Sequence, residues 1–231
     1  MNLIFDNDVS IEVVRTKRRK TASIQIIKGA VKVIVPQKLS DSRVEELIQK
    51  RTPWIRKKLG EQSQIVTPNP KEYISGENFT YLGRSYRLKV LSGNDYGVKL
   101  KGGCLEVTVP NKSKEEDVRN SLIKWYENHA LKQLTDKTKR YADIMGITPH
   151  SIFVRDYKSR WGSCSPEGKI SYNWRIIIAP HNIVNYVVIH ELCHIVHPNH
   201  SPSYWRFVKT KIPDYDICRQ WLRVHEDMLV L

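Results

Sequence analysis

Two similar segments of the chain alternate between apolar and polar positions. Residues 29–36 (GAVKVIVP) and 103–110 (GCLEVTVP) each have the period of a half-buried strand, and each ends in Val-Pro. A polar turn and a stretch with apolar residues at helical spacing follow each of them. We interpret this as a duplicated strand–turn–helix unit, because two copies are too few for a solenoid.

The remaining pattern predicts further elements. Pro53 should kink the first helix or make it restart, because proline cannot donate a helical hydrogen bond. We expect a linker over 61–71, hairpin strands over 73–100, a helix over 115–145 ending near Gly146, strands over 151–157 and 169–178, a helix that Pro180 begins, and two helices within 203–231 broken around Pro213.

Strands followed by helices, without a regular βαβ rhythm, indicate an α+β fold. We expect two parts, a β-rich amino-terminal region over 1–112 that holds the repeat and a catalytic domain over 113–231. The 231 residues are enough for a core of this size.

The predicted helix after Pro180 carries the motif H-E-x-x-H at His190, Glu191 and His194. Positions i and i+4 lie on one helical face, so the two imidazoles are placed to hold one metal ion. Glu191 lies beside the open coordination position, where a general base is needed. The alternative is a buried His-Glu pair satisfied by hydrogen bonds alone.

A catalytic zinc site needs three protein ligands and one open position. His197 falls on the same helical face one turn further along, which is too far from the first two histidines. Pro198 disfavours further helix, so the chain can turn back and bring His200 to the ion. We favour His200 as the third ligand and expect one Zn²⁺ per chain. The rival ligands are the downstream carboxylates Asp214, Asp216 and Glu226.

Composition excludes several classes of protein. No run of residues approaches the roughly eighteen apolar positions of a membrane helix, and the first ten residues do not resemble a signal peptide. The four widely spaced cysteines are typical of reduced thiols. We therefore expect a cytoplasmic protein without membrane contact; the oligomeric state stays open.

The net charge of +14 is concentrated near the amino terminus, where residues 1–60 hold 14 Lys and Arg against 6 Asp and Glu. Such a surface attracts polyanions, which makes a nucleic acid or a nucleotide a possible partner. The alternative is a solvated hairpin tip. The candidate anion-binding residues are Arg15, Lys17, Arg18, Arg19 and Lys20.

Several segments together resemble one known family, the YgjP-like metallopeptidase domain, related to SprT-like and WLM metalloproteases. They are KSRWGSCS from Lys158, YVVIHELCH from Tyr186, HSPSYW from His200 and YLG from Tyr81. The similarity spans roughly 15–225. It implies a zincin-like fold, zinc bound by His190, His194 and His200, and Glu191 as catalytic base. His197 stands where metzincins have Gly, and no Met-turn is evident, so we do not place the chain among the metzincins.

We therefore predict a zinc metallohydrolase, most simply a peptidase acting on a peptide or protein through a water activated by Glu191. Arg160, His197 and Tyr204 are the candidates for contacting the substrate or the oxyanion. The alternatives are a metal-dependent nucleotide phosphohydrolase (a nucleoside triphosphate pyrophosphatase) and a nucleic-acid-associated module with structural zinc. The Arg160–Cys164 loop is either a substrate contact or a structural turn, and Cys164 lacks the base that a nucleophile needs.

Overall fold

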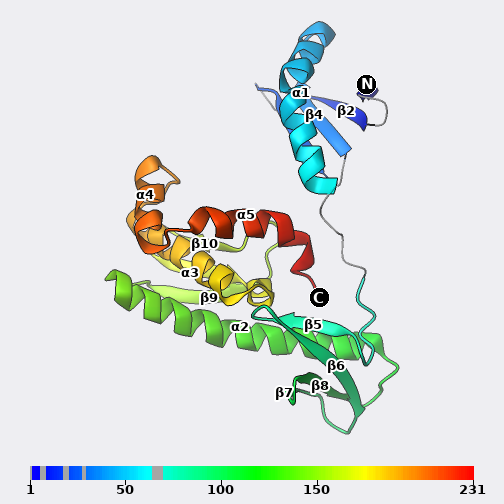
Figure 1. The fold of residues 1–231 in the computed structure, drawn as a ribbon, viewed down its shortest axis with the longest axis vertical. Coiled ribbons are helices and arrows are strands. Elements are labelled where there is room, and N and C mark those ends of the chain that lie inside the picture. Colours follow the sequence, from blue (N-terminus) through cyan, green and yellow to red (C-terminus); the bar gives the residue numbers. More distant parts are fainter. Residues whose placement is uncertain (1, 6–8, 18–20, 28–29, 64–69) are drawn as a thin grey trace. The chain divides into compact units, whose positions relative to one another are not determined.

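The first four strands form one sheet in the computed structural model, which describes residues 2–5, 9–17, 21–27, 30–63 and 70–231 (Figure 1). The strand order is β1-β2-β4-β3; β2 and β4 are parallel, and the other neighbours are antiparallel. The strands are β1 (Asn2–Phe5), β2 (Val9–Thr16), β3 (Ser23–Ile27) and β4 (Ala30–Pro36).

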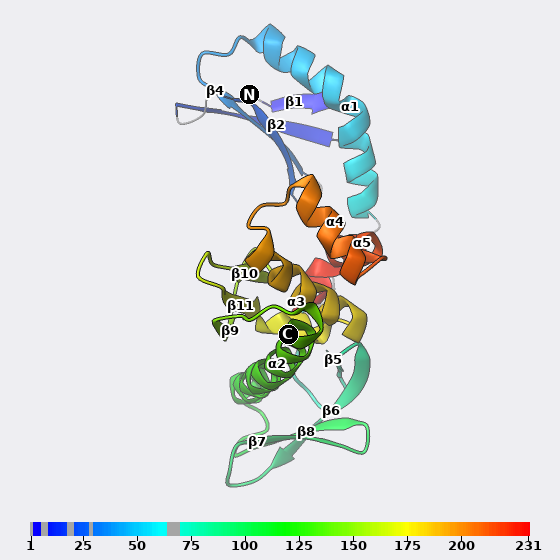
Figure 2. The ribbon, with the colours of Figure 1, turned by 90° about the vertical axis from the view of Figure 1, so that its left-hand side faces the viewer.

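Helix α1 (Asp41–Ser63) covers one face of this sheet, as Figure 2 shows. Of the predicted kink or restart at Pro53, the restart does not occur, because α1 continues through the proline, and Figure 2 shows α1 as a bent helix. The helix also occupies the beginning of the predicted linker. Proline removes one donor, and its exposed position leaves the freed carbonyl accessible to water. Between sheet and helix lies a small core of Ile11, Val13, Val31, Val33, Val35, Val44, Ile48 and Ile55.

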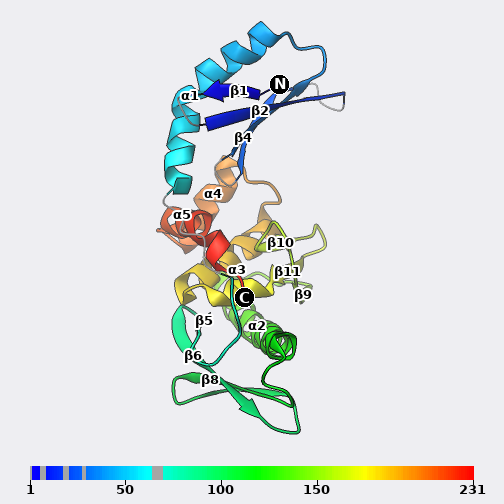
Figure 3. The same ribbon diagram turned by 90° about the vertical axis from the view of Figure 1, so that its right-hand side faces the viewer.

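A second four-stranded sheet has the same strand order and the same strand directions. It runs β5-β6-β8-β7, with β6 and β8 parallel and the other neighbours antiparallel. Figure 3 labels β5, β6 and β8 of this sheet. Its strands are β5 (Asn78–Tyr81), β6 (Arg84–Ser92), β7 (Gly97–Lys101) and β8 (Cys104–Val109).

The long helix α2 (Glu115–Met145) follows this sheet and contacts β7 and β8. It ends at Gly146, as predicted, and this glycine has the left-handed conformation (φ 67°) that most residues avoid. Fully buried apolar residues of α2, such as Leu122 and Leu134, join it to the main core.

A third sheet has the order β10-β11-β9, with strands β9 (Ser151–Arg155), β10 (Gly162–Cys164) and β11 (Lys169–Asn173). The strand predicted over 169–178 was therefore too long, because Trp174–Ile178 forms a 3-10 helix, η1. The Asn173 side chain accepts a hydrogen bond from the Arg175 N–H and begins this turn. Ile176, Ile177 and Ile178 are all buried, which a strand with two different faces does not allow.

Three α-helices and a short 3-10 helix complete the chain, and the predicted break around Pro213 is confirmed. They are α3 (His181–Val196), α4 (Pro202–Lys211), α5 (Tyr215–His225) and η2 (Glu226–Met228). With five α-helices and three sheets in its described part, the chain is α+β, as predicted. No described helix combines the length and apolar character needed to cross a membrane.

The chain divides into two compact units, Met1–Thr67 and Pro68–Leu231. The sequence pattern predicts a boundary after residue 112 instead. The difference arises because β7 and β8 pack against α2, so the second sheet belongs with the helices that follow it. Each unit has its own hydrophobic core, and the motif lies in the second.

The turn between β5 and β6 contacts the segment that precedes α3. The backbone N–H of Leu82 donates to the Ile177 carbonyl at 2.7 Å, and that of Gly83 donates to Ile178 at 3.3 Å. Gly83 has φ 79°, and a Cβ there would lie 2.8 Å from the Pro180 Cα. Only glycine suits both the conformation and the close approach, so this turn fixes the beginning of the motif helix.

Candidate metal centre

Helix α3 is buried on most of its surface, and Pro180 immediately precedes it, as predicted. It ends at Val196; His197 has extended backbone angles, and its N–H still donates to the Cys193 carbonyl. Pro198 cannot continue the helix, so the chain turns back before α4 begins at Pro202. His200 lies in this turn and reaches the face of α3 that carries His190 and His194.

The Nε2 atoms of the three histidines converge. His200 Nε2 lies 3.1 Å from His190 Nε2 and 3.2 Å from His194 Nε2. Tetrahedral zinc with Zn–N distances of roughly 2.0–2.1 Å requires its ligand nitrogens to be roughly 3.3 Å apart. These two spacings fit such an ion, and the ligand atoms of all three histidines lie within 4.8 Å of one another. In the described part of the chain this is the one cluster of histidine, cysteine or carboxylate groups arranged in this way.

Hydrogen bonds alone do not satisfy this cluster. His194 Nδ1 lies 3.1 Å from the His197 carbonyl, which assigns its proton to Nδ1 and leaves Nε2 as an acceptor. A proton on His200 Nε2 can serve His190 or His194, but not both. Burial, together with the smaller effects of the neighbouring His194 and His200, lowers the pKa of His190 to about 3, so the ring stays neutral. A metal ion is one partner that satisfies all three Nε2 atoms at once.

Aromatic residues of α4 support the imidazoles. The Tyr204 ring stacks on His194 with centroids 4.5 Å apart, and the Trp205 ring stacks on His200 at 5.4 Å. Tyr204 is fully buried, and its hydroxyl donates to the backbone carbonyl of His190 at 3.1 Å. These contacts restrict the orientation of the rings, as second-layer contacts do at metal sites.

Glu191 is 4% exposed, and burial raises the pKa of its carboxyl to about 8, while the positive charge of Arg160 opposes that rise. Among the described residues, none donates a hydrogen bond to this carboxylate. Gly162 lies directly against it, since a Cβ there would be 2.5 Å from Oε1. The carboxylate therefore keeps its capacity to accept a proton from a molecule in the adjacent cavity.

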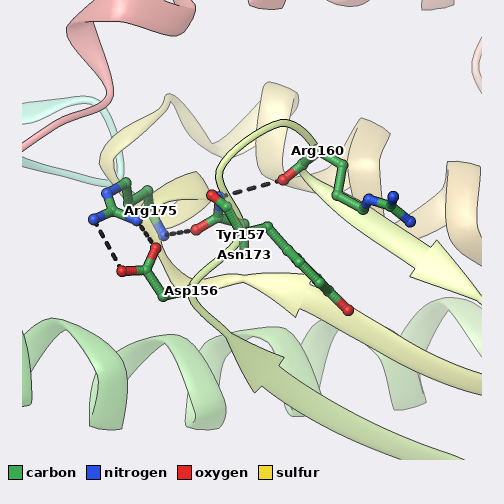
Figure 4. Close-up of polar contacts among 5 residues, drawn as sticks. All are labelled: Asp156, Tyr157, Arg160, Asn173 and Arg175. Carbon is green, nitrogen blue, oxygen red and sulfur yellow. Dashed lines mark hydrogen bonds and ion pairs between the residues drawn. The ribbon is translucent and has the colours of Figure 1, made fainter.

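The loop before β10 is fastened to β11 through Asn173, as Figure 4 shows. The Asn173 side-chain amide donates to the carbonyls of Tyr157 (2.9 Å) and Arg160 (3.2 Å), and Arg175 pairs with Asp156 at the base of the loop. The two hydrogen bonds from Asn173 are accepted by backbone carbonyls of the loop and not by its side chains. The Arg160 guanidinium points away from Asn173 in Figure 4 and lies 5.7 Å from the Tyr157 ring centroid.

Not every candidate residue joins the cluster. The His197 ring contacts Phe207, with centroids 5.5 Å apart, and only its carbonyl reaches a motif histidine. The rival carboxylates Asp214, Asp216 and Glu226 are outside the histidine cluster as well. Burial, with a smaller effect from the charge of Glu191, raises the pKa of the Cys164 thiol to about 11, which opposes a nucleophilic role.

The basic amino-terminal residues lie in the first unit. Arg15 donates to the Gln37 carbonyl at 3.3 Å and pairs with Asp41, while Lys17 is exposed. Arg18, Arg19 and Lys20 lie outside the described residues. Strands β2 and β3 each pair with β4, and the alternative of a solvated hairpin tip falls mainly on residues outside the described part of the chain. Nucleic-acid binding by this cluster stays a prediction.

A cavity of about 320 Å³ adjoins Glu191 and His190. Arg160 comes from the loop, whereas Arg219 and Arg223 come from α5, and sequence reasoning overlooked these two arginines. Their i, i+4 spacing on a strongly amphipathic helix was the available signal. The remaining lining residues are Trp161, Gly162, Tyr186, Val187, Leu222 and Glu226.

Comparison with known proteins gives one match to a family. The model of the YgjP-like metallopeptidase domain matches residues 20–225. Among solved structures, that of the metallopeptidase zymogen of Pyrococcus abyssi abylysin is similar, with 23% identity and a TM-score of 0.36 over 40% of this chain and 92% of that one. No curated protein matches the chain.

Proposed function

We propose that this chain, which belongs to the YgjP-like metallopeptidase domain family, is a zinc-dependent peptidase with His190, His194 and His200 as metal ligands. One observation carries the proposal: three Nε2 atoms converge at the spacing of a tetrahedral ion, and Glu191 lines the same cavity as His190. The family supports the metallopeptidase class, and the geometry supports these particular residues.

A zinc ion held by His190, His194 and His200 would supply a Lewis acid for the scissile carbonyl and for the attacking water. Glu191 takes the proton of that water and returns it to the leaving amine. Its pKa, raised to about 8 by burial, makes it a stronger base than an exposed carboxylate. Gly162 holds it in place by contact, and the bonds from Asn173 hold the loop that carries Gly162.

Strand β10 supports a peptide as the substrate. It is an edge strand, paired with β11 on one side, and it packs beside α3. An extended peptide can add to such an edge through main-chain hydrogen bonds. The peptide would then lie along Gly162–Cys164, with its backbone next to Glu191.

The three candidates for contacting the substrate have different roles in this proposal. Arg160 lines the cavity and is assigned to the substrate. Tyr204 uses its hydroxyl on the His190 carbonyl, and His197 turns its ring toward Phe207, so both are assigned to support of the site. Three protein ligands leave a coordination position open, which favours a catalytic ion over a structural one.

We also propose that the two β-sheet regions descend from one duplicated strand–turn–helix unit. The shared order of β1-β2-β4-β3 and β5-β6-β8-β7 supports this, as does the long helix that follows each sheet.

The decisive experiment compares the wild type with Glu191→Gln after both are stripped of metal and given one equivalent of zinc. An unfolded protein is the substrate, and mass spectrometry detects new peptide ends. Wild type should cleave it, whereas Glu191→Gln should keep its zinc and lose about 10²-fold or more in rate. Exposed Glu127 provides the matched control as Glu127→Gln. Equal rates in Glu191→Gln and wild type would contradict the role of Glu191.

A further inference from the structure

The cavity beside Glu191 is positively charged on two sides. Arg160 approaches it from the loop before β10, and Arg219 and Arg223 approach it from α5, which packs beside α3. Its two carboxylates are Glu191 and Glu226. The three guanidinium groups carry three positive charges, and the two carboxylates carry two negative charges when both are ionised. The net charge of these groups is therefore at least +1.

Two of these arginines form no ion pair with a carboxylate in the described part of the chain. The Arg219 guanidinium lies 4.9 Å from the Trp205 ring centroid, and that of Arg160 lies 5.7 Å from the Tyr157 ring centroid. An aromatic face attracts a guanidinium but leaves its N–H groups available at the edge. Both groups can thus donate to an anion that enters the cavity.

The walls and the size of the cavity restrict what that anion can be. Trp161, Val187 and Leu222 give it apolar surface, which suits an aliphatic stem that carries the charge. A volume of about 320 Å³ corresponds to roughly ten water molecules in the liquid. Glu226 in the wall repels a group with several negative charges, so a single carboxylate fits better than a polyphosphate.

We propose that this cavity is a substrate subsite for a carboxylate group, which gives the enzyme a preference for peptides with an acidic residue or a free carboxyl terminus next to the scissile bond. The inference rests on the proposed peptidase function, because the cavity is a substrate subsite only if His190 and Glu191, which line it, belong to a peptidase active site. Arg160 and Arg219 donate to the carboxylate, and the apolar wall receives the stem.

The experiment uses the full chain loaded with zinc and a set of internally quenched peptides. At each of two positions on either side of the scissile bond, the peptides carry Glu, Gln or Lys in turn. Wild type should prefer Glu over Gln in kcat/KM by about tenfold or more at one position. Repeating that peptide with a free or an amidated carboxyl terminus distinguishes a side-chain carboxylate from a terminal one.

Variants then test the arginines. Arg160→Gln and Arg219→Gln should each reduce the preference for Glu, while Arg219→Glu should turn it into a preference for Lys. Zinc content is measured in each variant, because Arg219 also contacts Trp205, which stacks on His200. Arg206 of α4 is exposed and does not line the cavity, so Arg206→Gln is the matched control and should keep the preference.

A binding measurement separates this inference from the peptidase proposal. Fluorescence anisotropy gives the Kd of the Glu and Gln peptides on zinc-loaded Glu191→Gln, where no turnover is needed. Tighter binding of the Glu peptide without cleavage by the wild type would refute the peptidase and keep the subsite. Cleavage with equal Kd and equal kcat/KM for both peptides would refute the subsite alone. If a nucleoside triphosphate displaces the peptides and the Glu peptide binds no more tightly than the Gln peptide, the subsite would be assigned to a phosphate and not to a carboxylate.

Discussion

The Glu191 carboxylate lies against the α-carbon of Gly162, so closely that a methyl group on Gly162 would overlap it. A Cβ at this position would lie 2.5 Å from Oε1 and 2.7 Å from Cδ. Because Gly162 of β10 has no side chain, the Glu191 carboxylate can occupy this position. The fixed loop before β10 makes the contact rigid, because Asn173 bonds two of the loop carbonyls.

Replacing Gly162 by alanine should displace the Glu191 carboxylate and leave the histidines in place. We expect zinc binding to persist and the rate of hydrolysis to fall by about 10²-fold, the effect of a displacement of about 1 Å at a catalytic group. Steady-state kinetics and metal analysis on one preparation would test this. Gly97 has open space around it, so Gly97→Ala is the matched control. Normal kcat in Gly162→Ala would contradict the positioning role.

The metal site should depend on three histidines and not on the fourth. His190→Ala, His194→Ala and His200→Ala each remove one of the converging nitrogens, so tight zinc binding should be lost. His197→Ala should retain zinc, because the carbonyl that accepts from His194 belongs to the backbone. Metal analysis after dialysis measures both. Retention in His200→Ala together with loss in His197→Ala would reverse the assignment of the third ligand.

Removal of zinc should destabilise the second unit. An ion that binds only the folded chain adds about 2.7 kcal/mol to the free energy of unfolding at 100 times its Kd. We expect thermal unfolding of wild type to shift upward on zinc addition and downward with a chelator. The His194→Ala variant supplies the comparison, since its transition should no longer respond to zinc. A wild-type transition indifferent to zinc would count against a site in the folded protein.

Tyr204→Phe separates support of the site from transition-state stabilisation. The variant loses one neutral hydrogen bond, from the Tyr204 hydroxyl to the His190 carbonyl, and keeps the ring stacked on His194. We expect a loss of about 1 kcal/mol in unfolding free energy and less than about tenfold in kcat. Loss of an oxyanion donor costs about 10²–10³-fold, so a fall of that size would assign Tyr204 to the chemistry instead.

In the first unit, Arg15 connects β2 to the beginning of α1. It donates to the Gln37 and Leu39 carbonyls and pairs with Asp41. Arg15→Gln should lower the local stability by about 1 kcal/mol, measured as faster amide hydrogen exchange in β4 and α1. Arg43 forms an exposed pair with Glu46, so Arg43→Gln should change little. Equal exchange in the two variants would show that the Arg15 contacts contribute no more than a surface pair.

The sequence by itself determined the elements whose signals are local. The H-E-x-x-H spacing depends only on helical periodicity, and Pro198 ends the helix wherever it packs. The two Val-Pro strands and the Gly146 helix end are local in the same sense. Together they were enough to predict the α+β class and the three histidines that the fold brings together.

Only the tertiary structure decided which distant residues meet. Arg160 and Arg219 are 59 positions apart in the sequence and share one cavity because α5 packs on α3. The alternation after Asn173 suggested a longer strand, but burial of Ile176, Ile177 and Ile178 together favoured a 3-10 turn. The unit boundary at Thr67 depends on the packing of β7 and β8 against α2. Local patterns specify periodicity and chain breaks, whereas the pairing of faces depends on contacts between segments far apart in the chain.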